Sequence, residues 1–318
     1  MMILPISVVI PTLNRSERLS RTLRSLLDQS VTPAEVIIVD ASPDLFCVES
    51  LAEHPLFGHV EIDIHRAEIK GAAVQRNQAI SKVTQDYVLF ADDDVDIEPE
   101  CLKRLWSSMM ADETVGAVGV VFTNQSYHPP GRLFRRLLTI LGCPAEHSLA
   151  GRFCGPALNF LPSEGQKPVP TEWLNLCLTL VRSEALPSPP LLPFFQGYSL
   201  LEDAALTSHI SKTWKLVSTP TARAYHDTKP ADYKSRVVAR SEMEVVNRWF
   251  VMSRVLDRSS PGWNLRLVVY QVMMLILTLR SSVGWRNVIP SIFGMIKGYW
   301  RIVFHRRKWQ GYPTTNPL

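Results

Sequence analysis

The chain has 318 residues, of which 46% are hydrophobic and 20% are charged, and it contains 15 Gly and 23 Pro. This length suits one large domain or a domain with an appendage, and the composition excludes a disordered, collagen-like or low-complexity chain. The net charge of +4 is unevenly distributed: residues 1–228 carry 19 Lys and Arg against 26 Asp and Glu, whereas residues 229–318 carry 15 against 4. We therefore expect an acidic front part that handles cations and a basic tail that meets an anionic surface.

The first two-thirds of the chain alternates short apolar strands with amphipathic helices. Strands are predicted at residues 6–10, 36–39, 60–64 and 87–90, and helices at residues 16–27 and from about residue 71. Continuous apolar strands separated by helices are typical of an α/β fold, whose parallel sheet is covered on both faces. Ligands of such sheets bind at the carboxyl ends of the strands, and polar clusters stand there at residues 12–15, 40 and 92–94.

The pattern loosens after residue 121. Residues 125–170 are predicted to form long connections around a basic, apolar helix at 132–141. Residues 173–181 are predicted to form a further strand, and another helix is expected to start near Glu202.

The tail contains two apolar segments, residues 265–279 and 288–304, punctuated by arginine and lysine. A spanning helix needs about 20 apolar residues. The uninterrupted runs here are shorter, because Pro290, Gly294 and Gly298 break the second segment. We therefore predict helices that lie in a membrane interface, where basic side chains meet anionic lipid headgroups. A packed helical subdomain or a dimer contact is the alternative.

The cysteines indicate neither a disulfide framework nor a structural zinc site. They are five in number, widely spaced and without a C-x-x-C pair, namely Cys47, Cys101, Cys143, Cys154 and Cys177. This usage favours a reducing compartment, and the first residues lack the basic region of a secretory signal.

Three adjacent aspartates, Asp92, Asp93 and Asp94, follow a predicted buried strand. Their mutual repulsion is costly unless a positive group binds there. Mg or Mn, which prefer oxygen ligands and bridge phosphates, would resolve it. A solvated acidic turn is the alternative.

Several short motifs occur in a fixed order. They are VVIPTLNR at 8–15, VDAS at 39–42, the segment 71–77, FADDD at 90–94, the pair Glu202–Asp203, and Tyr225–His226. Together they resemble a non-processive, bacterial-type family 2 glycosyltransferase with a GT-A fold, over residues 5 to about 230. The resemblance implies a Rossmann-like α/β domain with a mostly parallel central sheet and flanking helices. This catalytic domain would span 1–230, with a nucleotide-sugar half (1–125) and an acceptor half (126–230), before a basic, apolar, membrane-associating helical region at 231–318.

The resemblance assigns the donor nucleotide to four positions. Thr12 and Asn14 would border the nucleotide, Asp40 would accept a hydrogen bond from uracil or thymine, and Arg76 would approach the phosphate or the base. The alternatives are that Asp40 forms the turn before Ser42 and that Arg76 is a surface helix residue.

The aspartate run and a histidine would complete the donor site. Asp92 would face the ribose hydroxyls, Asp94 would ligate the metal that bridges the diphosphate, and Asp93 lies between them as a further donor-site residue. His226 matches a histidine that completes the metal site in many relatives. Its alternative role is that of an ordinary hydrogen-bonded polar side chain.

Glu202 and Asp203 match the acidic pair of the family. Asp203 would be the general base that removes the acceptor hydroxyl proton, and Glu202 would orient it or substitute for it. Attack from the face opposite the leaving diphosphate would invert the anomeric centre. The alternative is an acidic pair that complements a helix N-terminus.

The chain departs from the family pattern at two places. Leu176 and Cys177 stand where a glycine-containing step is common, so acceptor geometry does not carry over. Arg248–Trp249 resembles the end of the Q-x-x-R-W motif of processive synthases, but Val245 occupies the Gln position. Transfer of a single sugar is therefore expected.

The sequence thus predicts a glycosyltransferase that uses Mg or Mn and a UDP- or dTDP-type sugar. Its acceptor would be a glycan or lipid-linked saccharide in cell-surface polysaccharide synthesis. It would work in the cytoplasm on the anionic inner face of the membrane, without nucleic acid. The alternatives are a catalytically silent binding module on the same fold and a sugar-phosphate nucleotidyltransferase. The latter would need a Gly-rich loop where residues 11–14 stand.

Overall fold

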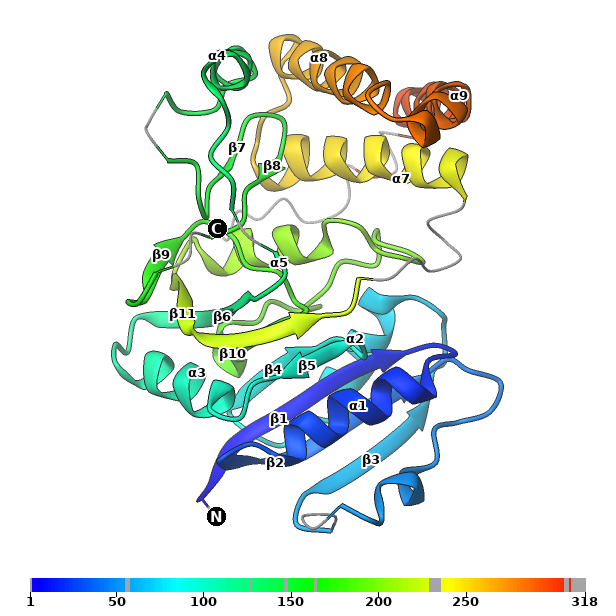
Figure 1. Cartoon of the computed structure of the whole chain (residues 1–318). Coiled ribbons are helices and arrows are strands. Elements are labelled where there is room, and N and C mark those ends of the chain that lie inside the picture. The colour runs from blue at the N-terminus through cyan, green and yellow to red at the C-terminus, as the bar shows by residue number, and fades with distance from the viewer. Residues whose placement is uncertain are drawn as a thin grey trace. The chain divides into compact units, whose positions relative to one another are not determined.

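The computed structural model describes residues 2–54, 58–125, 127–145, 148–162, 165–228, 236–305 and 309 (Figure 1). They group into two compact units, the first formed by residues 1–127 and 161–228 and the second by residues 128–160 and 229–318. Residues 128–160, which the sequence analysis includes in the acceptor half, therefore group with the C-terminal helices. The functional halves themselves stay predictions.

The first unit is built on a nine-stranded sheet in the order β3-β2-β1-β4-β10-β6-β11-β5, with β9 paired to β11. The strands are β1 (Met2–Thr12), β2 (Val31–Asp40), β3 (Glu61–Arg66), β4 (Tyr87–Ala91), β5 (Val95–Ile97), β6 (Val115–Phe122), β9 (Val169–Thr171), β10 (Leu178–Arg182) and β11 (Lys215–His226). β10 is antiparallel to both of its neighbours, β4 and β6, while β11 is parallel to β6. Strands β3, β2, β1, β4, β6 and β11 therefore share one direction, and the sheet is mostly parallel as predicted.

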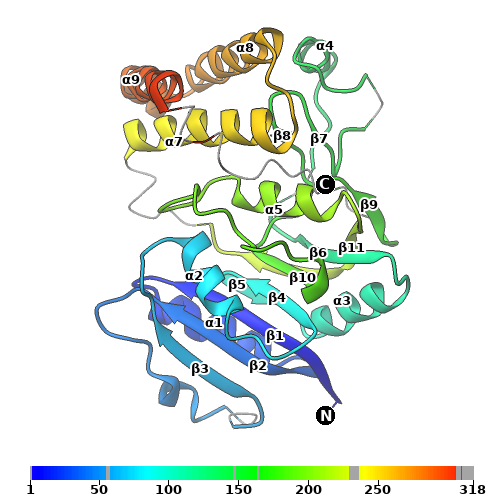
Figure 2. The same ribbon diagram turned by 180° about the vertical axis from the view of Figure 1, so that it is seen from behind.

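Helices cover both faces of this sheet. They are α1 (Ser16–Leu27), α2 (Ala72–Ile80), α3 (Cys101–Met110) and α5 (Glu202–Ile210), with short turns η1 (Val48–Leu51) and η2 (Ser183–Ala185). Leu19, Leu23 and Leu26 recur at helical spacing on α1 and are buried in the core with the strand residues. In Figure 1, α1 lies in front of the sheet, whereas α2 lies in front of it when the sheet is seen from behind in Figure 2.

The strand predicted at residues 173–181 is wrong in its first half, because β10 begins only at Leu178. The preceding residues form a turn around Asn175. The Asn175 side chain accepts the Cys177 N–H at 3.2 Å, and the Asn175 carbonyl accepts the Thr179 hydroxyl. Asparagine bonds of this local kind compete with a strand ladder.

The second unit is mainly helical. It contains α4 (Arg132–Ile140), the pair β7 (Phe153–Cys154) and β8 (Leu158–Asn159), α7 (Val237–Phe250), the π-helical segment η3 (Val251–Val255), α8 (Pro261–Thr278) and α9 (Ser282–His305). α9 packs along α7, and Lys297 and Arg301 of α9 lie 3.8 and 3.5 Å from Glu242 of α7.

The expectation that Pro290, Gly294 and Gly298 interrupt the last segment is wrong, because α9 runs through all three. The two glycines let α9 approach α7 closely. A Cβ at Gly294 would lie 2.4 Å from the Val238 carbonyl oxygen, and one at Gly298 would lie 2.9 Å from the Cβ of Val245. The glycines are therefore contact positions rather than helix ends.

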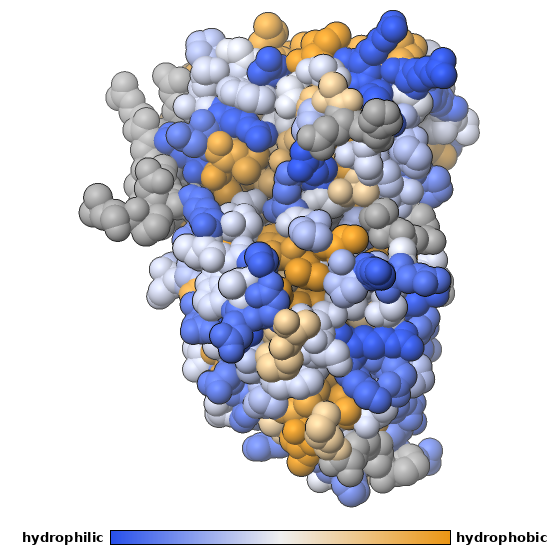
Figure 3. All heavy atoms as spheres, turned by 90° about the vertical axis from the view of Figure 1, so that its left-hand side faces the viewer, coloured by the Kyte–Doolittle hydropathy of each residue, from blue (hydrophilic) through white to orange (hydrophobic). Residues whose placement is uncertain are grey.

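One face of the C-terminal helices is apolar and exposed, although no helix in the described part of the chain has the length and apolar character needed to cross a membrane. This apolar face consists of Leu265, Val268, Val269, Val272 and Ile276 of α8, and Val283, Trp285, Ile289, Ile292, Phe293, Ile296, Trp300, Val303 and Phe304 of α9. In Figure 3, hydrophobic surface lies beside strongly hydrophilic surface at the top of the view, the end at which α4, α8 and α9 lie.

Candidate active site

The carboxyl ends of three neighbouring parallel strands meet at one edge of the sheet. Thr12 at the end of β1 is paired in register with Asp40 at the end of β2, and Asp92 directly follows β4 on the other side of β1. Gln75 of α2 ties two of these ends together, because its amide donates to the carbonyl oxygens of Thr12 and Val39 at 2.9 and 2.8 Å. The sheet therefore gathers the polar clusters that the sequence places at strand ends.

Asp40 holds the loop that follows β2. One carboxylate oxygen accepts the backbone N–H and the hydroxyl of Ser42, and the other accepts the Phe46 N–H at 2.9 Å. The Ser42 hydroxyl oxygen also accepts the N–H of Asn14 at 2.7 Å, and Asn14 has a left-handed φ of 55°. Asp40 thus makes the contacts of the turn-forming alternative, and the nucleotide roles of Asp40 and Asn14 stay predictions.

Asp93 and Asp94 are buried and paired with arginines near the start of α1. Asp93 accepts the Thr12 hydroxyl at 2.7 Å and Arg15 at 2.8 Å, and Asp94 accepts Arg15 at 3.1 Å and Arg18 at 3.4 Å. Burial raises the pKa of Asp93 to about 6, although Arg15 acts in the opposite direction. A solvated acidic turn does not describe these two residues.

Arg76 bridges two carboxylates. Its Nη2 donates to Asp92 and its Nη1 donates to Glu202 at 2.8 Å. Burial alone would lower the pKa of Arg76, but Asp92 and Glu202 raise it; burial would raise the pKa of Asp92, but Arg76 and His226 lower it. The surface-residue alternative for Arg76 is wrong, since the side chain is buried. Its guanidinium faces protein carboxylates, so its approach to a nucleotide stays a prediction.

Glu202 and Asp203 begin α5, where the sequence predicts a helix start. Burial raises the pKa of Glu202 to about 8 even beside Arg76. Burial also raises the pKa of Asp203 to about 6, although Asp203 accepts the Ala204 N–H at 2.7 Å. A carboxyl group with a pKa near 6 is ionised at neutral pH and is a stronger base than an ordinary aspartate.

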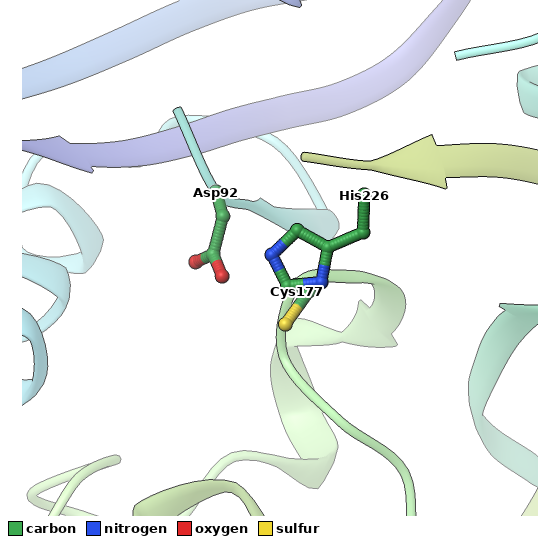
Figure 4. Close-up of side chains that lie close together, drawn as sticks. All are labelled: Asp92, Cys177 and His226. Carbon is green, nitrogen blue, oxygen red and sulfur yellow. The ribbon is translucent and has the colours of Figure 1, made fainter. Parts of the chain in front are cut away.

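His226, the last residue of β11, lies between the aspartate run and Gln125 and near Cys177. Its Nε2 lies 3.1 Å from Oδ1 of Asp94, and its Nδ1 lies 3.1 Å from Nε2 of Gln125. Within the described ranges, the group that could hold a metal ion is Asp92, Cys177 and His226, whose ligand atoms all lie within 4.8 Å of one another. Figure 4 shows these three side chains converging from separate segments.

The charges of this cluster do not balance. Its carboxyl groups belong to Asp92, Asp93, Asp94, Glu202 and Asp203, and the guanidinium groups that pair with them belong to Arg15, Arg18 and Arg76. With all carboxyls ionised, the negative charges exceed the positive ones by two, and with Glu202 protonated, as its pKa of about 8 implies at neutral pH, they exceed them by one. A bound divalent cation would offset this excess. Carboxylate oxygens and imidazole are suitable ligands for such an ion, so the residues present fit a divalent metal.

Four residues of the cluster were missed as site candidates by the sequence analysis. Arg15 and Arg18 pair with the aspartates, and Asp227 accepts Arg21 at 3.1 Å while its N–H donates to the Asp94 carbonyl oxygen. The motif around Arg15 and the adjacency of Asp227 to the predicted histidine were available signals. Cys177 had none, because only the antiparallel pairing of β10 with β4 brings it opposite Asp92.

Comparison with known sequences finds a matching family model. Residues 7–143 match the family model described as Glycosyl transferase family 2. The uncharacterized glycosyltransferase YibD of Escherichia coli (strain K12) is 32% identical over 111 residues, which are 34% of this chain and 31% of that protein. The putative teichuronic acid biosynthesis glycosyltransferase TuaG of Bacillus subtilis (strain 168) is 30% identical over 105 residues, which are 33% of this chain and 42% of that protein. The amylovoran biosynthesis glycosyltransferase AmsB of Erwinia amylovora is 38% identical over 90 residues, which are 28% of this chain and 30% of that protein. Residues 7–143 therefore match the predicted family, and the chain spans less than half the length of these bacterial relatives.

Solved structures share the fold. The mannosyltransferase PcManGT from Pyrobaculum calidifontis, solved with GDP-Man and Mn²⁺, superposes with a TM-score of 0.51 over 93% of this chain and 87% of its own, at 16% identity. GalNAc-T7, solved with UDP, GalNAc and Mn²⁺, gives a TM-score of 0.50 over 70% of this chain and 43% of its own, also at 16% identity. These likenesses concern the fold alone, and they confirm the predicted GT-A class of α/β fold.

Proposed function

We propose that this chain, whose residues 7–143 belong to glycosyl transferase family 2, moves one sugar from a nucleoside-diphosphate sugar to a glycan or lipid-linked acceptor with inversion at the anomeric carbon. The observation that carries the proposal is the convergence of Asp92, Asp94, His226 and the Glu202–Asp203 pair in the first unit. Two of the relatives are named for polysaccharide biosynthesis, which supports a role in making a cell-surface polysaccharide.

The donor would bind at the strand-end cluster. Asp92 and Asp94 with His226 would hold a divalent cation, which when bound supplies positive charge to the departing diphosphate. Thr12 and Asn14 border the same edge, and the structures solved with nucleotides and Mn²⁺ on this fold make such a donor reasonable. We propose a UDP- or dTDP-type donor, because Asp40 stands at the end of β2 where a pyrimidine N3–H could be accepted.

Asp203 would be the general base. Its pKa of about 6 leaves it ionised at neutral pH and able to take the proton of an acceptor hydroxyl. Glu202 is held by Arg76 at 2.8 Å, so Glu202 would orient the site rather than accept that proton. Ionisation of Asp203 gives the expected pH dependence, with turnover rising as the pH increases through about 6.

Ligand binding is the test of the donor site. The melting temperature of the purified chain should rise when Mn²⁺ and UDP or dTDP are added together, and it should not rise in EDTA. GDP serves as the comparison nucleotide. A screen of nucleotide sugars for slow hydrolysis by the chain with Mn²⁺ would then identify the donor.

Each alternative has its own signature in these assays. A silent binding module would bind nucleotide and turn over no donor, and a nucleotidyltransferase would release pyrophosphate from a nucleoside triphosphate. Asp203→Asn should reduce transfer by roughly 10²–10⁴-fold while nucleotide binding survives. Full activity in that variant would show that a residue other than Asp203 is the general base.

The second unit would hold the protein on a membrane. The exposed apolar side chains of α8 and α9 are more numerous than the single apolar residues scattered over an ordinary protein surface. Cationic side chains stand on the same two helices and between them, namely Arg266 on α8, Arg280 between the helices, and Arg286, Lys297 and Arg301 on α9. Apolar side chains with flanking cations suit the boundary of an anionic leaflet. We therefore place the proposed reaction at the cytoplasmic face of the cell membrane.

Co-sedimentation with vesicles tests this placement. The chain should pellet with phosphatidylglycerol vesicles, less so at high salt, and Ile289→Glu/Ile296→Glu should remain in the supernatant. Ile69→Glu is the matched control, because Ile69 is an exposed apolar residue of the first unit. If the parent chain does not pellet with the vesicles, the proposed membrane binding is wrong. If the parent chain is instead a dimer and the double variant is a monomer, the apolar face is a contact with a second copy of the chain.

A further inference from the structure

Cys177 lies next to the aspartate run although it is distant in sequence. It precedes β10, which pairs antiparallel with β4 so that Leu178 is opposite Ala91. The Asp92 N–H donates to the Cys177 carbonyl oxygen at 2.9 Å, and the Cys177 sulfur lies within 4.8 Å of an Asp92 carboxylate oxygen. The sheet register therefore fixes a sulfur atom beside the first aspartate.

His226 completes a compact set of three different ligand atoms. The Asp92 oxygen, the Cys177 sulfur and a His226 nitrogen all lie within 4.8 Å of one another. A single ion bound at about 2.0–2.3 Å from each would hold such atoms within about 4.6 Å of one another. The three segments in Figure 4 thus already come close to the arrangement that one ion requires.

We propose that Cys177 is a ligand of the divalent cation in the donor site, so that this cation is held by sulfur as well as by nitrogen and oxygen. The inference rests on the cation site of the proposed function, and it adds the identity of the preferred metal. Binding would form a metal–sulfur bond and release the thiol proton to solvent.

Sulfur changes which ion the site prefers. Oxygen-only sites suit Mg²⁺ and Mn²⁺, whereas thiolate ligands favour Zn²⁺, Co²⁺ and Cd²⁺. We therefore expect Cys177→Ser to weaken the binding of Zn²⁺ and Co²⁺ much more than that of Mg²⁺ or Mn²⁺, because the remaining nitrogen and oxygen ligands still serve all four ions.

A cobalt titration of the full chain tests the proposal without any turnover. Co²⁺ should produce the near-ultraviolet absorption of a cobalt–thiolate bond, and Cys177→Ser should abolish it. The double variant Cys143→Ser/Cys154→Ser is the control, because these two thiols contact each other in the second unit and could bind Co²⁺ as a pair, independently of Cys177. Absorption that survives in Cys177→Ser and vanishes in the control would overturn the proposal.

Competition binding gives the magnitude. In Cys177→Ser the Zn²⁺ dissociation constant should rise roughly tenfold or more, while that for Mn²⁺ should change by less than about threefold. Equal changes for both ions would contradict a sulfur ligand. Stabilisation of Cys177→Ser by Mn²⁺ with UDP would show that the proposed donor site stands whatever the outcome for sulfur.

A measurement on the unmodified chain covers the case of a variant that fails to fold. Cd²⁺ should slow alkylation of Cys177 by iodoacetamide, read by mass spectrometry of the peptides, and should leave the exposed Cys47 unaffected. Unchanged alkylation of Cys177 at saturating Cd²⁺ would refute the proposal.

Discussion

Asp203→Asn should stabilise the metal-free protein at neutral pH. Burial raises the pKa of Asp203 from its ordinary 3.8 to about 6, so keeping this carboxylate ionised costs folding free energy. Asparagine is nearly the same size, and its side-chain oxygen can still accept the Ala204 N–H. The variant therefore removes the charge and keeps the contact.

The magnitude follows from the shift. A pKa unit corresponds to about 1.4 kcal/mol, which gives roughly 3 kcal/mol for Asp203, and screening of the partly exposed carboxylate reduces this to about 2 kcal/mol. For unfolding of 200–300 residues, this raises the melting temperature by roughly 3–5 °C.

The sign depends on pH. A carboxyl group with a raised pKa favours the folded state below the unfolded pKa, and that advantage is lost as the pH rises through about 6. The variant and the parent chain should therefore melt together near pH 4 and separate progressively up to pH 7, with the variant higher.

The assay is thermal unfolding in EDTA from pH 4 to pH 7. Asp112→Asn is the control with the opposite sign, because Lys215 and Thr114 hold the pKa of Asp112 below its usual range. An Asp203→Asn protein that melts at or below the parent temperature at pH 7 would refute the reasoning, as would an Asp112→Asn protein that gains stability in step with it.

Two further changes test the packing of each unit. Arg76→Met should destabilise the first unit by about 3–5 kcal/mol in urea unfolding, because it leaves the buried carboxyl groups of Asp92 and Glu202 without their shared partner. A decrease in the free energy of unfolding of less than about 1 kcal/mol would contradict the bridging role. Gly298→Ala should destabilise the α7–α9 contact by about 1–3 kcal/mol, since the added Cβ would meet Val245 at 2.9 Å. Gly262→Ala, whose Cβ would lie 3.8 Å from its nearest neighbour, should cost much less, and equal effects would show that crowding is not the cause.

The strand-end half of the site could be predicted because its residues are local in sequence. An apolar strand followed at once by Asp92, Asp93 and Asp94 defines both the element and the edge on which the carboxylates stand. The same holds for Thr12 and Asp40, each at the end of a parallel strand, and for the helix that starts at Glu202. The contacts that these side chains make could not be predicted in the same way.

The contacts that the sequence missed join distant segments. Arg76 meets Glu202 across 126 positions of the chain, and Cys177 meets Asp92 only because β10 runs antiparallel between β4 and β6. In α9, composition suggested breaks at Gly294 and Gly298, but packing against α7 uses the missing Cβ atoms. Which side chains contact one another therefore depends on how distant segments pack in the folded chain, and the spacing of residues in the sequence does not predict that packing.

The central claim is that one cation and a diphosphate share the cluster around His226. Crystals grown with Mn²⁺ and UDP, measured at the manganese absorption edge, would locate the ion directly. The account predicts one strong anomalous peak in contact with His226 and with Asp92 or Asp94, and beside the UDP phosphates. A peak bound elsewhere, or UDP seated without any ion near His226, would contradict it.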